Sequence, residues 1–234
     1  MQNYHPYPPL LDASIIERAA QFGSAELADG MKNLGIEQDG CMDAKMLPID
    51  ENSRVVGTAV TVETKDGDNF PIHVAIYQGM PGYVLVIDGK GYEGKAYLGD
   101  LIGGAAKAVG LNGIIVDGMV RDRQGLKEMG LPVFSKGFMQ RGPSKIGPGA
   151  INTPIVCAGA HVKPGDLVVG DSDGVSVVPR ERIEEVFAAA EKKLQYEQKR
   201  RVTIEEYESC KKEGKPLPQL APQWVLDMLN GKQP

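Results

Sequence analysis

A strand, a helix and a second strand follow one another near the middle of the chain, and this succession constrains the fold most. Tyr83–Asp88 is an apolar run between Gly82 and Gly89, which is typical of a strand covered on both faces. Helical spacing of apolar residues predicts a helix over 95–109, and Ile114–Val116 is a second buried strand. Strands joined in this way are parallel and connected by a right-handed crossover. The sequence therefore predicts an α/β fold.

The segments around this unit predict further layers. N-terminal to it we expect a proline-rich extended arm and two short helices, which begin after Asp12 and at Ser24. Further along we expect strands over 54–64 and 132–135, helices over 70–77 and 123–129, a long loop over 137–155, and a β-hairpin of Leu167–Val169 with Val175–Val178.

The C-terminal part of the chain differs from the rest in its polarity. A charged helix of about 30 residues is expected from Arg180, followed by an irregular tail and a short helix over Trp224–Leu229. A helix this polar usually lies on a surface or on another subunit. We therefore expect residues 1–179 to form the core and 180–234 to form a helical extension that contacts a neighbouring subunit.

Composition limits the classes of protein that fit the chain. With 26 basic and 31 acidic residues the formal charge is −5, which argues against a nucleic-acid partner. No apolar run approaches the roughly 20 residues of a membrane helix, and the N-terminus lacks a signal core, so neither membrane contact nor export is expected. Cys41, Cys157 and Cys210 are widely scattered, which favours free thiols in a reducing compartment. We expect a cytoplasmic protein.

A glycine motif follows the first strand of the central unit. Gly89, Gly91 and Gly94 form a GxGxxG ahead of the predicted helix, and Asp117 lies about 20 residues on, as in a dinucleotide-binding fingerprint. Nucleotide-binding halves normally continue with more alternating strands and helices, whereas this chain turns to hairpins after residue 135. A connecting loop is the favoured interpretation, and a nucleotide-dependent enzyme is kept as an alternative.

Histidines and cysteines do not predict a metal site. His5, His73 and His161 show no paired spacing, and no two cysteines lie close together in the sequence. We interpret the histidines as packed or surface residues. Any metal bound here should be a hard ion that takes carboxylate and water ligands.

Two acids and an arginine mark the ends of the two central strands. Taken singly, Asp100 could cap a helix, and Arg121 with Asp122 could be a surface ion pair. Together they follow neighbouring parallel strands, where α/β sheets place their ligands. Free amides at the start of the helix could bind a carboxylate there, namely those of Gly99, Leu101 and Ile102. The sequence therefore predicts a site for a hard metal ion and a carboxylate-bearing ligand.

Several motifs in the same order and spacing make the chain resemble the RraA-like superfamily over about residues 20–200. They are Asp68-Asn69-x-x-Ile72-His73, Val84–Asp88, Gly99–Ile102, Gly113-x-x-x-Asp117-Gly118-x-Val120-Arg121-Asp122, Leu131–Phe134, Pro164–Asp166 and Asp171-x-Asp173-Gly174-Val175. The resemblance implies an αββα sandwich assembled as a homotrimer or homohexamer.

That superfamily has two branches, metal-dependent pyruvate aldolases and RraA itself, a protein inhibitor of ribonuclease E. The aldolases carry an Arg-Asp pair where the inhibitor lacks the acid, and this chain has Arg121-Asp122. The resemblance implies that Asp122 binds Mg²⁺ or Mn²⁺ directly, that Arg121 binds the keto acid and that Asp100 acts through water. It also implies a glutamate from a neighbouring subunit, which also acts through water; Glu197 fits best, and Glu191 and Glu205 stay open.

The reaction implied by the resemblance is cleavage of a 4-hydroxy-2-keto dicarboxylic or tricarboxylic acid to pyruvate and a second keto acid. It passes through a pyruvate enolate, needs no organic cofactor, and would also serve to decarboxylate oxaloacetate. Two alternatives stay open: a ribonuclease-binding regulator without catalysis, and a Schiff-base mechanism on Lys90 or Lys95. Past about residue 205 the tail departs from the resemblance.

Overall fold

The computed structural model describes residues 3–231 of the chain. Contacts divide the chain into two compact units, Met1–Ala190 and Glu191–Pro234. The first unit contains the sheets and most of the helices, and the second contains most of one long helix and a short one. The predicted boundary at residue 180, and contact with a neighbouring subunit, stay predictions.

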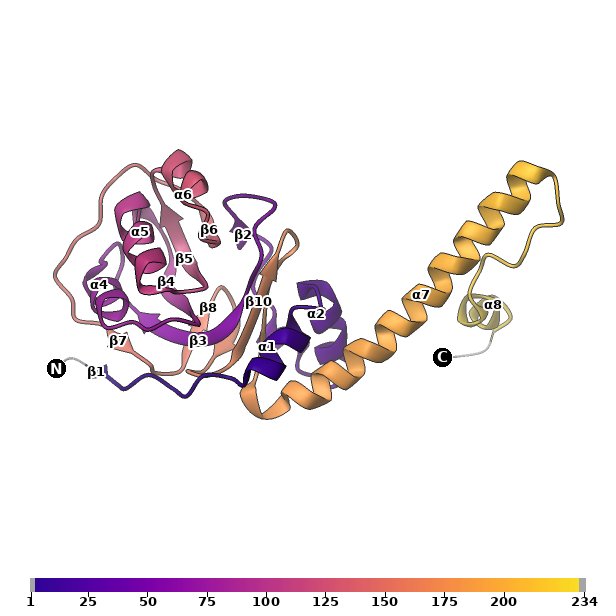
Figure 1. The fold of residues 1–234 in the computed structure, drawn as a ribbon, viewed down its shortest axis with the longest axis horizontal. Coiled ribbons are helices and arrows are strands. Elements are labelled where there is room, and N and C mark those ends of the chain that lie inside the picture. The colour runs from indigo at the N-terminus through magenta and orange to yellow at the C-terminus, as the bar shows by residue number, and fades with distance from the viewer. Residues whose placement is uncertain (1–2, 232–234) are drawn as a thin grey trace. The chain divides into compact units, whose positions relative to one another are not determined.

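Four parallel strands form the centre of the main sheet (Figure 1). They are β3 (Val55–Glu63), β4 (Tyr83–Ala96), β5 (Gly113–Val120) and β6 (Val133–Phe138), hydrogen-bonded in that order. Helix α5 (Asp100–Val109) connects β4 to β5, and Gly110 ends it in the left-handed conformation. The predicted parallel unit is confirmed.

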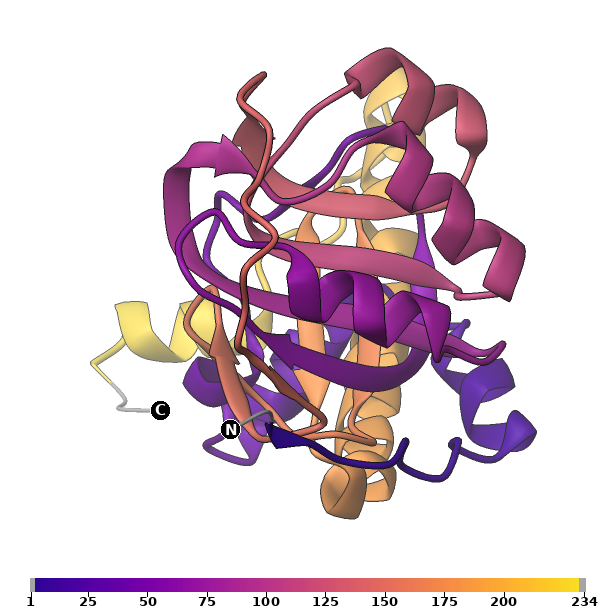
Figure 2. The same ribbon diagram turned by 90° about the vertical axis from the view of Figure 1, so that its left-hand side faces the viewer.

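Alternate residues of these strands face two separate cores. Leu85 and Ile87 pack in the core that also contains residues of α4 (Phe70–Tyr77), α5 and α6 (Arg123–Met129). Val84 and Val86 belong to a second core with residues of the later strands. Because both faces are covered, each strand reads as a continuous apolar run. Figure 2 shows α4 and α5 lying across one face of the strands.

A smaller set of strands and helices covers the opposite face of the sheet. Strands β10 (Leu167–Asp171) and β11 (Gly174–Val178) form the predicted antiparallel hairpin, and β10 also pairs with β3. The other elements here are β8 (Ile155–Cys157), β9 (Ala160–Val162), α1 (Ala13–Ala19), α2 (Ser24–Asn33) and α3 (Glu37–Gly40). The fold is an α/β, αββα sandwich, as the resemblance implied.

The remaining elements are short, apart from one helix. Strands β1, β2 and β7 span Asn3–Tyr4, Leu47–Pro48 and Ala150–Ile151. A turn of 3₁₀ helix (Arg180–Arg182) leads into α7 (Ile183–Glu213), a 31-residue helix of the predicted length, and α8 spans Gln223–Leu229. Within the second unit the Arg200 guanidinium donates to the carbonyl of Leu220 at 2.7 Å.

The glycine motif is the largest difference from the predicted elements. Strand β4 continues through Gly89–Gly94 to Ala96, so neither the connecting loop nor a helix from residue 95 is correct. The backbone of Lys90 (φ 59°) and Gly91 (φ 65°) shifts the pairing register with β5 without ending the strand. A dinucleotide fingerprint needs its glycines in the turn that opens a helix, and these lie inside a strand.

Part of the expected long loop is also strand. Strand β6 runs to Phe138, and β7 and β8 form between residues 150 and 157. Within residues 3–231, no helix is both long and apolar enough to cross a membrane.

Candidate active site

A cleft of about 430 Å³ lies at the carboxyl ends of β4 and β5, beside the starts of α4, α5 and α6. Its lining comprises Asn69, His73, Tyr77, Leu98, Gly99, Asp100, Leu101, Ile102, Arg121, Asp122, Gly142, Pro143 and Lys145. All six residues predicted for the site within the core therefore meet in one cleft. The chain passes from β4 to α5 and from β5 to α6 at the same edge of the sheet, and this brings the six residues together.

The start of α5 supplies backbone donors to this cleft. Gly99 is the N-cap residue, and its carbonyl accepts from the amide of Gly103 at 3.0 Å. The amides of Leu101 and Ile102 lie in the first helical turn, where no intrahelical acceptor is available. These amides and the positive end of the helix dipole suit an anionic group such as a carboxylate.

Asp122 occupies the turn between β5 and α6 in a left-handed conformation, with φ 56° and ψ 45°. Among residues with side chains, Asn and Asp adopt this conformation most readily. A Cβ atom on Gly99 would overlap Oδ2 of Asp122, so only glycine leaves room for this carboxylate beside the helix start. The local backbone thus places the Asp122 carboxylate beside Gly99, the residue that caps α5.

Arg121 lies next to Asp122 without being fully paired to it. Its Nε is 3.4 Å from Oδ2 of Asp122, and the side chains are 43% and 41% exposed. The backbone amide of Arg121 donates to the carbonyl of Leu98 at 3.0 Å, which joins the ends of the two strands. Most donors of the guanidinium therefore stay available to a planar anion in the cleft.

Asp100 adds a second carboxylate to the cleft lining. It is the first residue of α5, and its side chain lies beside Gly125 of α6. Asp100 makes no ion pair or side-chain hydrogen bond with the described residues. Two exposed carboxylates fit a hard divalent cation that keeps several water ligands. No group of three potential ligands among His, Cys, Asp and Glu is present within residues 3–231 to form a complete protein cage.

Three polar residues of the cleft were not predicted as site residues. The amide nitrogen of Asn69 donates to the carbonyl of Tyr97 at 3.0 Å, and its Oδ1 is buried without a partner in the described chain. Burial, followed by the charge of Lys145, lowers the pKa of His73, so this imidazole is neutral at pH 7. Asn69 and His73 occur in the quoted motifs, whereas Lys145 comes from the expected loop and has no local signal.

Glu197 lies on the part of α7 that belongs to the second unit. Its carboxylate is 3.8 Å from Lys193 and 3.8 Å from Arg201. All residues that line the cleft come from the first unit. The assignment of Glu197, rather than Glu191 or Glu205, to a neighbouring subunit's site stays a prediction.

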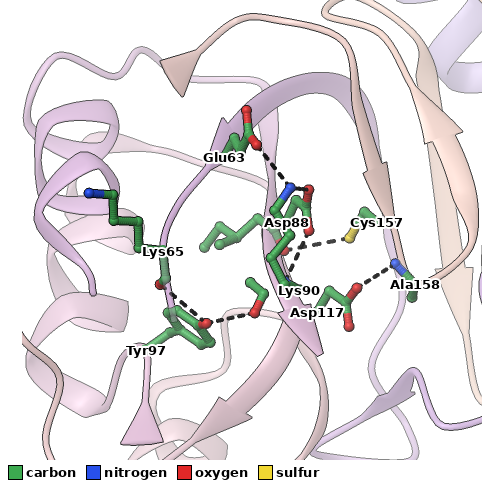
Figure 3. Close-up of polar contacts among 10 residues, drawn as sticks. Glu63, Lys65, Asp88, Lys90, Tyr97, Asp117, Cys157 and Ala158 are labelled. Carbon is green, nitrogen blue, oxygen red and sulfur yellow. Dashed lines mark hydrogen bonds and ion pairs between the residues drawn. The ribbon is translucent and has the colours of Figure 1, made fainter. Parts of the chain in front are cut away.

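The two lysines of the Schiff-base alternative do not line the cleft. Lys90 Nζ lies 2.9 Å from Glu63 and 2.5 Å from Asp88. Figure 3 shows Lys90 between these two carboxylates. Burial alone would lower the pKa of Lys90, but the bonds to these carboxylates outweigh it and raise the pKa. Lys95 Nζ bonds to the Ser144 hydroxyl at 2.6 Å. Both amines bond to other polar side chains and neither lines the cleft, so the geometry opposes this alternative.

Comparisons with known proteins identify relatives of this chain. The RraA-like family model, described as Aldolase/RraA, matches residues 24–177. A protein of Halalkalibacterium halodurans named "Putative 4-hydroxy-4-methyl-2-oxoglutarate aldolase" is 41% identical over 169 residues, which cover 72% of this chain and 77% of that protein.

Solved structures share the fold as well. An uncharacterised protein from Pseudomonas syringae pv. tomato matches with a TM-score of 0.72 at 27% identity, over 90% of this chain and 97% of that one. Streptomyces coelicolor RraAS2, described as an unusual member of the RNase ES inhibitor RraA protein family, matches with a TM-score of 0.74 at 28% identity, over 82% and 98% of the two chains.

Proposed function

The chain belongs to the RraA-like family of aldolase and RraA proteins, and from this premise we propose that it is a divalent-metal-dependent lyase. It cleaves a 4-hydroxy-2-keto dicarboxylic or tricarboxylic acid to pyruvate and a second keto acid, and also decarboxylates oxaloacetate. The observation that carries the proposal is the convergence of Arg121, Asp122 and Asp100, incompletely paired, on one cleft beside free helix amides. The aldolase name of the 41% identical relative supports the same reaction class.

Each residue of the cleft has a role in this proposal. The Arg121 guanidinium and the amides of Leu101 and Ile102 bind the α-keto acid end of the substrate. Asp122 would hold Mg²⁺ or Mn²⁺, and Asp100 would orient water in the cleft. When bound, the metal supplies Lewis-acid stabilisation of the negative charge that develops on the keto oxygen. Arg121 stabilises the same charge with donors that need not reorganise.

The cleavage itself requires two proton movements. The C4 hydroxyl loses its proton, the C3–C4 bond breaks, and its electron pair forms the pyruvate enolate, which then takes a proton at C3. We assign both transfers to water held by Asp100 and by Glu197 of a second copy of the chain. Oxaloacetate loses carbon dioxide to give the same enolate, so one site serves both reactions.

Exposed apolar side chains at the cleft support assembly into a homotrimer or homohexamer. Leu101, in the cleft wall, is 85% exposed, and Ile146, next to Lys145 in the chain, is 82% exposed. Large apolar side chains exposed in this way are typical of a contact surface. In the proposed assembly a neighbouring copy covers this surface and brings in its C-terminal helix. The scattered cysteines fit a reducing compartment, so we place the protein in the cytoplasm.

A coupled assay for pyruvate tests the proposal. The substrates are a small panel of 4-hydroxy-2-keto acids and oxaloacetate, each with EDTA, and with Mg²⁺ or Mn²⁺ restored. We expect EDTA to abolish pyruvate release and either metal to restore it. Undiminished release in EDTA would contradict the metal-dependent mechanism.

A ribonuclease-binding regulator is the second candidate, since RraAS2 shares the fold. Tight capture of a ribonuclease by the purified protein, with no lyase activity on any substrate of the panel, would favour it. The structure does not support a nucleotide-dependent enzyme, because a dinucleotide-binding motif needs its glycines in a strand-to-helix turn. Gly89, Gly91 and Gly94 lie inside β4.

A further inference from the structure

A second hollow adjoins the cleft along α4. It has a volume of about 450 Å³ and is lined by Phe70, His73, Val74, Tyr77, Gln78 and Lys145. Three of these residues, His73, Tyr77 and Lys145, also line the cleft. A molecule bound by Arg121 and Asp122 could therefore extend past this shared wall into the hollow.

The hollow differs from the cleft in its chemistry. Its walls are mostly aromatic or aliphatic, and no carboxylate lines it. The His73 ring lies 5.7 Å from the Tyr77 ring, and its lowered pKa keeps it uncharged. Tyr77 is 68% exposed, so its ring is accessible to a ligand in the hollow. The charged group in the lining is Lys145, at the border with the cleft.

The border lysine and the apolar walls together define what the hollow would accept. An aromatic or branched alkyl group gains free energy by leaving water against Phe70, Val74 and Tyr77. A carboxylate on the same carbon atom can reach Lys145 at the border. A second carboxylate farther in would lose its hydration without finding a second cation, because Lys145 is the one charged residue among those that line the hollow.

We propose that this hollow binds the C4 substituent of the substrate, and that the preferred substrate is a 4-hydroxy-2-oxoglutarate with an aromatic or branched alkyl group on C4. The inference rests on the proposed lyase function. Cleavage then breaks the C3–C4 bond. C4, with its carboxylate and apolar group, becomes the keto carbon of the second product as its hydroxyl loses a proton, and C3 takes the electron pair and a proton to give pyruvate. No oxidant or reductant is involved.

Three substrates test this subsite in the full-length protein. The first is the aldol adduct of pyruvate with phenylpyruvate, which carries a benzyl group on C4. The second carries a carboxymethyl group there, and the third, oxaloacetate, has no such substituent. We expect kcat/KM for the benzyl substrate to exceed that for the carboxymethyl substrate by roughly tenfold or more. A preference for the carboxymethyl substrate would overturn the inference.

Variants of the hollow supply the second measurement. Tyr77→Ser and Val74→Asp should lower the ratio of benzyl to oxaloacetate kcat/KM by roughly tenfold or more. Tyr77 is exposed, so its variant should fold even if Val74→Asp does not. Leu47→Ser, a change of an exposed leucine on β2, is the matched control and should leave the ratio within about twofold.

The outcomes separate the subsite from the function on which it rests. Turnover of oxaloacetate with an unchanged ratio in Tyr77→Ser would overturn the subsite alone. Absence of pyruvate from every substrate, oxaloacetate included, would overturn the proposed lyase function and the subsite with it.

Discussion

Two clefts lie at the carboxyl edge of the same sheet, on opposite faces, and both contain acids. The first is the candidate active site, with Asp100 and Asp122. The second, of about 660 Å³, is bordered by the β8–β9 hairpin and contains Glu63, Asp88 and Asp117 from three neighbouring strands. Figure 3 shows these three acids, with Lys90 between Glu63 and Asp88. Judged by its number of acids alone, the second cleft would be the stronger candidate for a metal site.

The partners of the acids separate the two clefts. In the second cleft Lys90 bridges Glu63 and Asp88, and Lys136 lies 2.6 Å from Asp117, whose other oxygen accepts from the amide of Ala158 at 2.8 Å. Among the described residues that line the first cleft, the one ion pair is the 3.4 Å contact of Arg121 with Asp122. Paired buried charges maintain a fold, whereas unpaired exposed ones are available to a ligand.

Arginine substitution should show the largest effect in this comparison. Arg121→Ala should lower kcat for pyruvate release by on the order of 10²–10³, because a fixed donor to the developing negative charge is lost. Arg123→Ala is the matched control, since Arg123 stacks over Phe138 at 4.7 Å and is not among the residues lining the cleft. Equal losses in the two variants would remove the distinction drawn for Arg121.

Glycine substitution tests whether the position of Asp122 matters. Gly99→Ala should lower kcat by on the order of 10², because the added methyl group displaces the Asp122 carboxylate. Gly104→Ala in the same helix is the control, because a Cβ there meets nothing within 4 Å. It should retain activity and raise the free energy of unfolding by about 0.5–1 kcal/mol. Full activity of Gly99→Ala would contradict the close approach of Asp122.

Substitution of Lys90 in the second cleft should lower the free energy of unfolding without lowering pyruvate release. Lys90→Met leaves the buried Asp88 carboxylate without its cation and should lower the free energy of unfolding by about 1–3 kcal/mol, measured in urea. Pyruvate release per folded chain should stay within about twofold of wild type. Lys95→Met, which loses only a bond to Ser144, is the milder control. A loss of turnover without a loss of stability would assign Lys90 to catalysis instead.

The same variant predicts a pH dependence. Burial raises the pKa of Asp88, and hydrogen bonds from Lys90 oppose that rise. Without Lys90 the pKa should rise further. A carboxyl group with a raised folded pKa contributes stability at low pH that is lost as pH rises through that pKa. The stability deficit of Lys90→Met should therefore be larger at about pH 8 than at about pH 5. A deficit that does not vary with pH would contradict this account of Asp88.

The sequence predicted which residues meet at the sheet edge better than it predicted the conformation of the neighbouring glycine motif. Asp100, Arg121 and Asp122 could be placed because the edge of a parallel sheet follows from the order of strands and helices. The continuation of β4 to Ala96 could not, because Gly89–Gly94 has the composition of a turn and pairs only through long-range contacts with β5. Tertiary pairing there outweighs local preference.

Other features of the site depend on contacts between distant segments. The burial of His73 and the position of Lys145 arise where α4 meets the loop before β7, which local patterns do not encode. The left-handed turn at Asp122 has only a weak local signal, the tolerance of Asp for that conformation. The pairing of Lys90 with Asp88 also needed the structure, since it depends on a backbone turn within a strand.

Side-by-side measurement of Asp122→Asn and Asp117→Asn tests the central claim most directly. Each change neutralises one acid: Asp117 lies within β5 and lines the second cleft, and Asp122 follows β5 and lines the first. We predict that Asp122→Asn loses pyruvate release by on the order of 10²-fold or more and no longer responds to added Mn²⁺. Asp117→Asn should keep turnover per folded chain and lose stability. Normal metal-dependent turnover in Asp122→Asn, with loss of turnover in folded Asp117→Asn, would contradict the account.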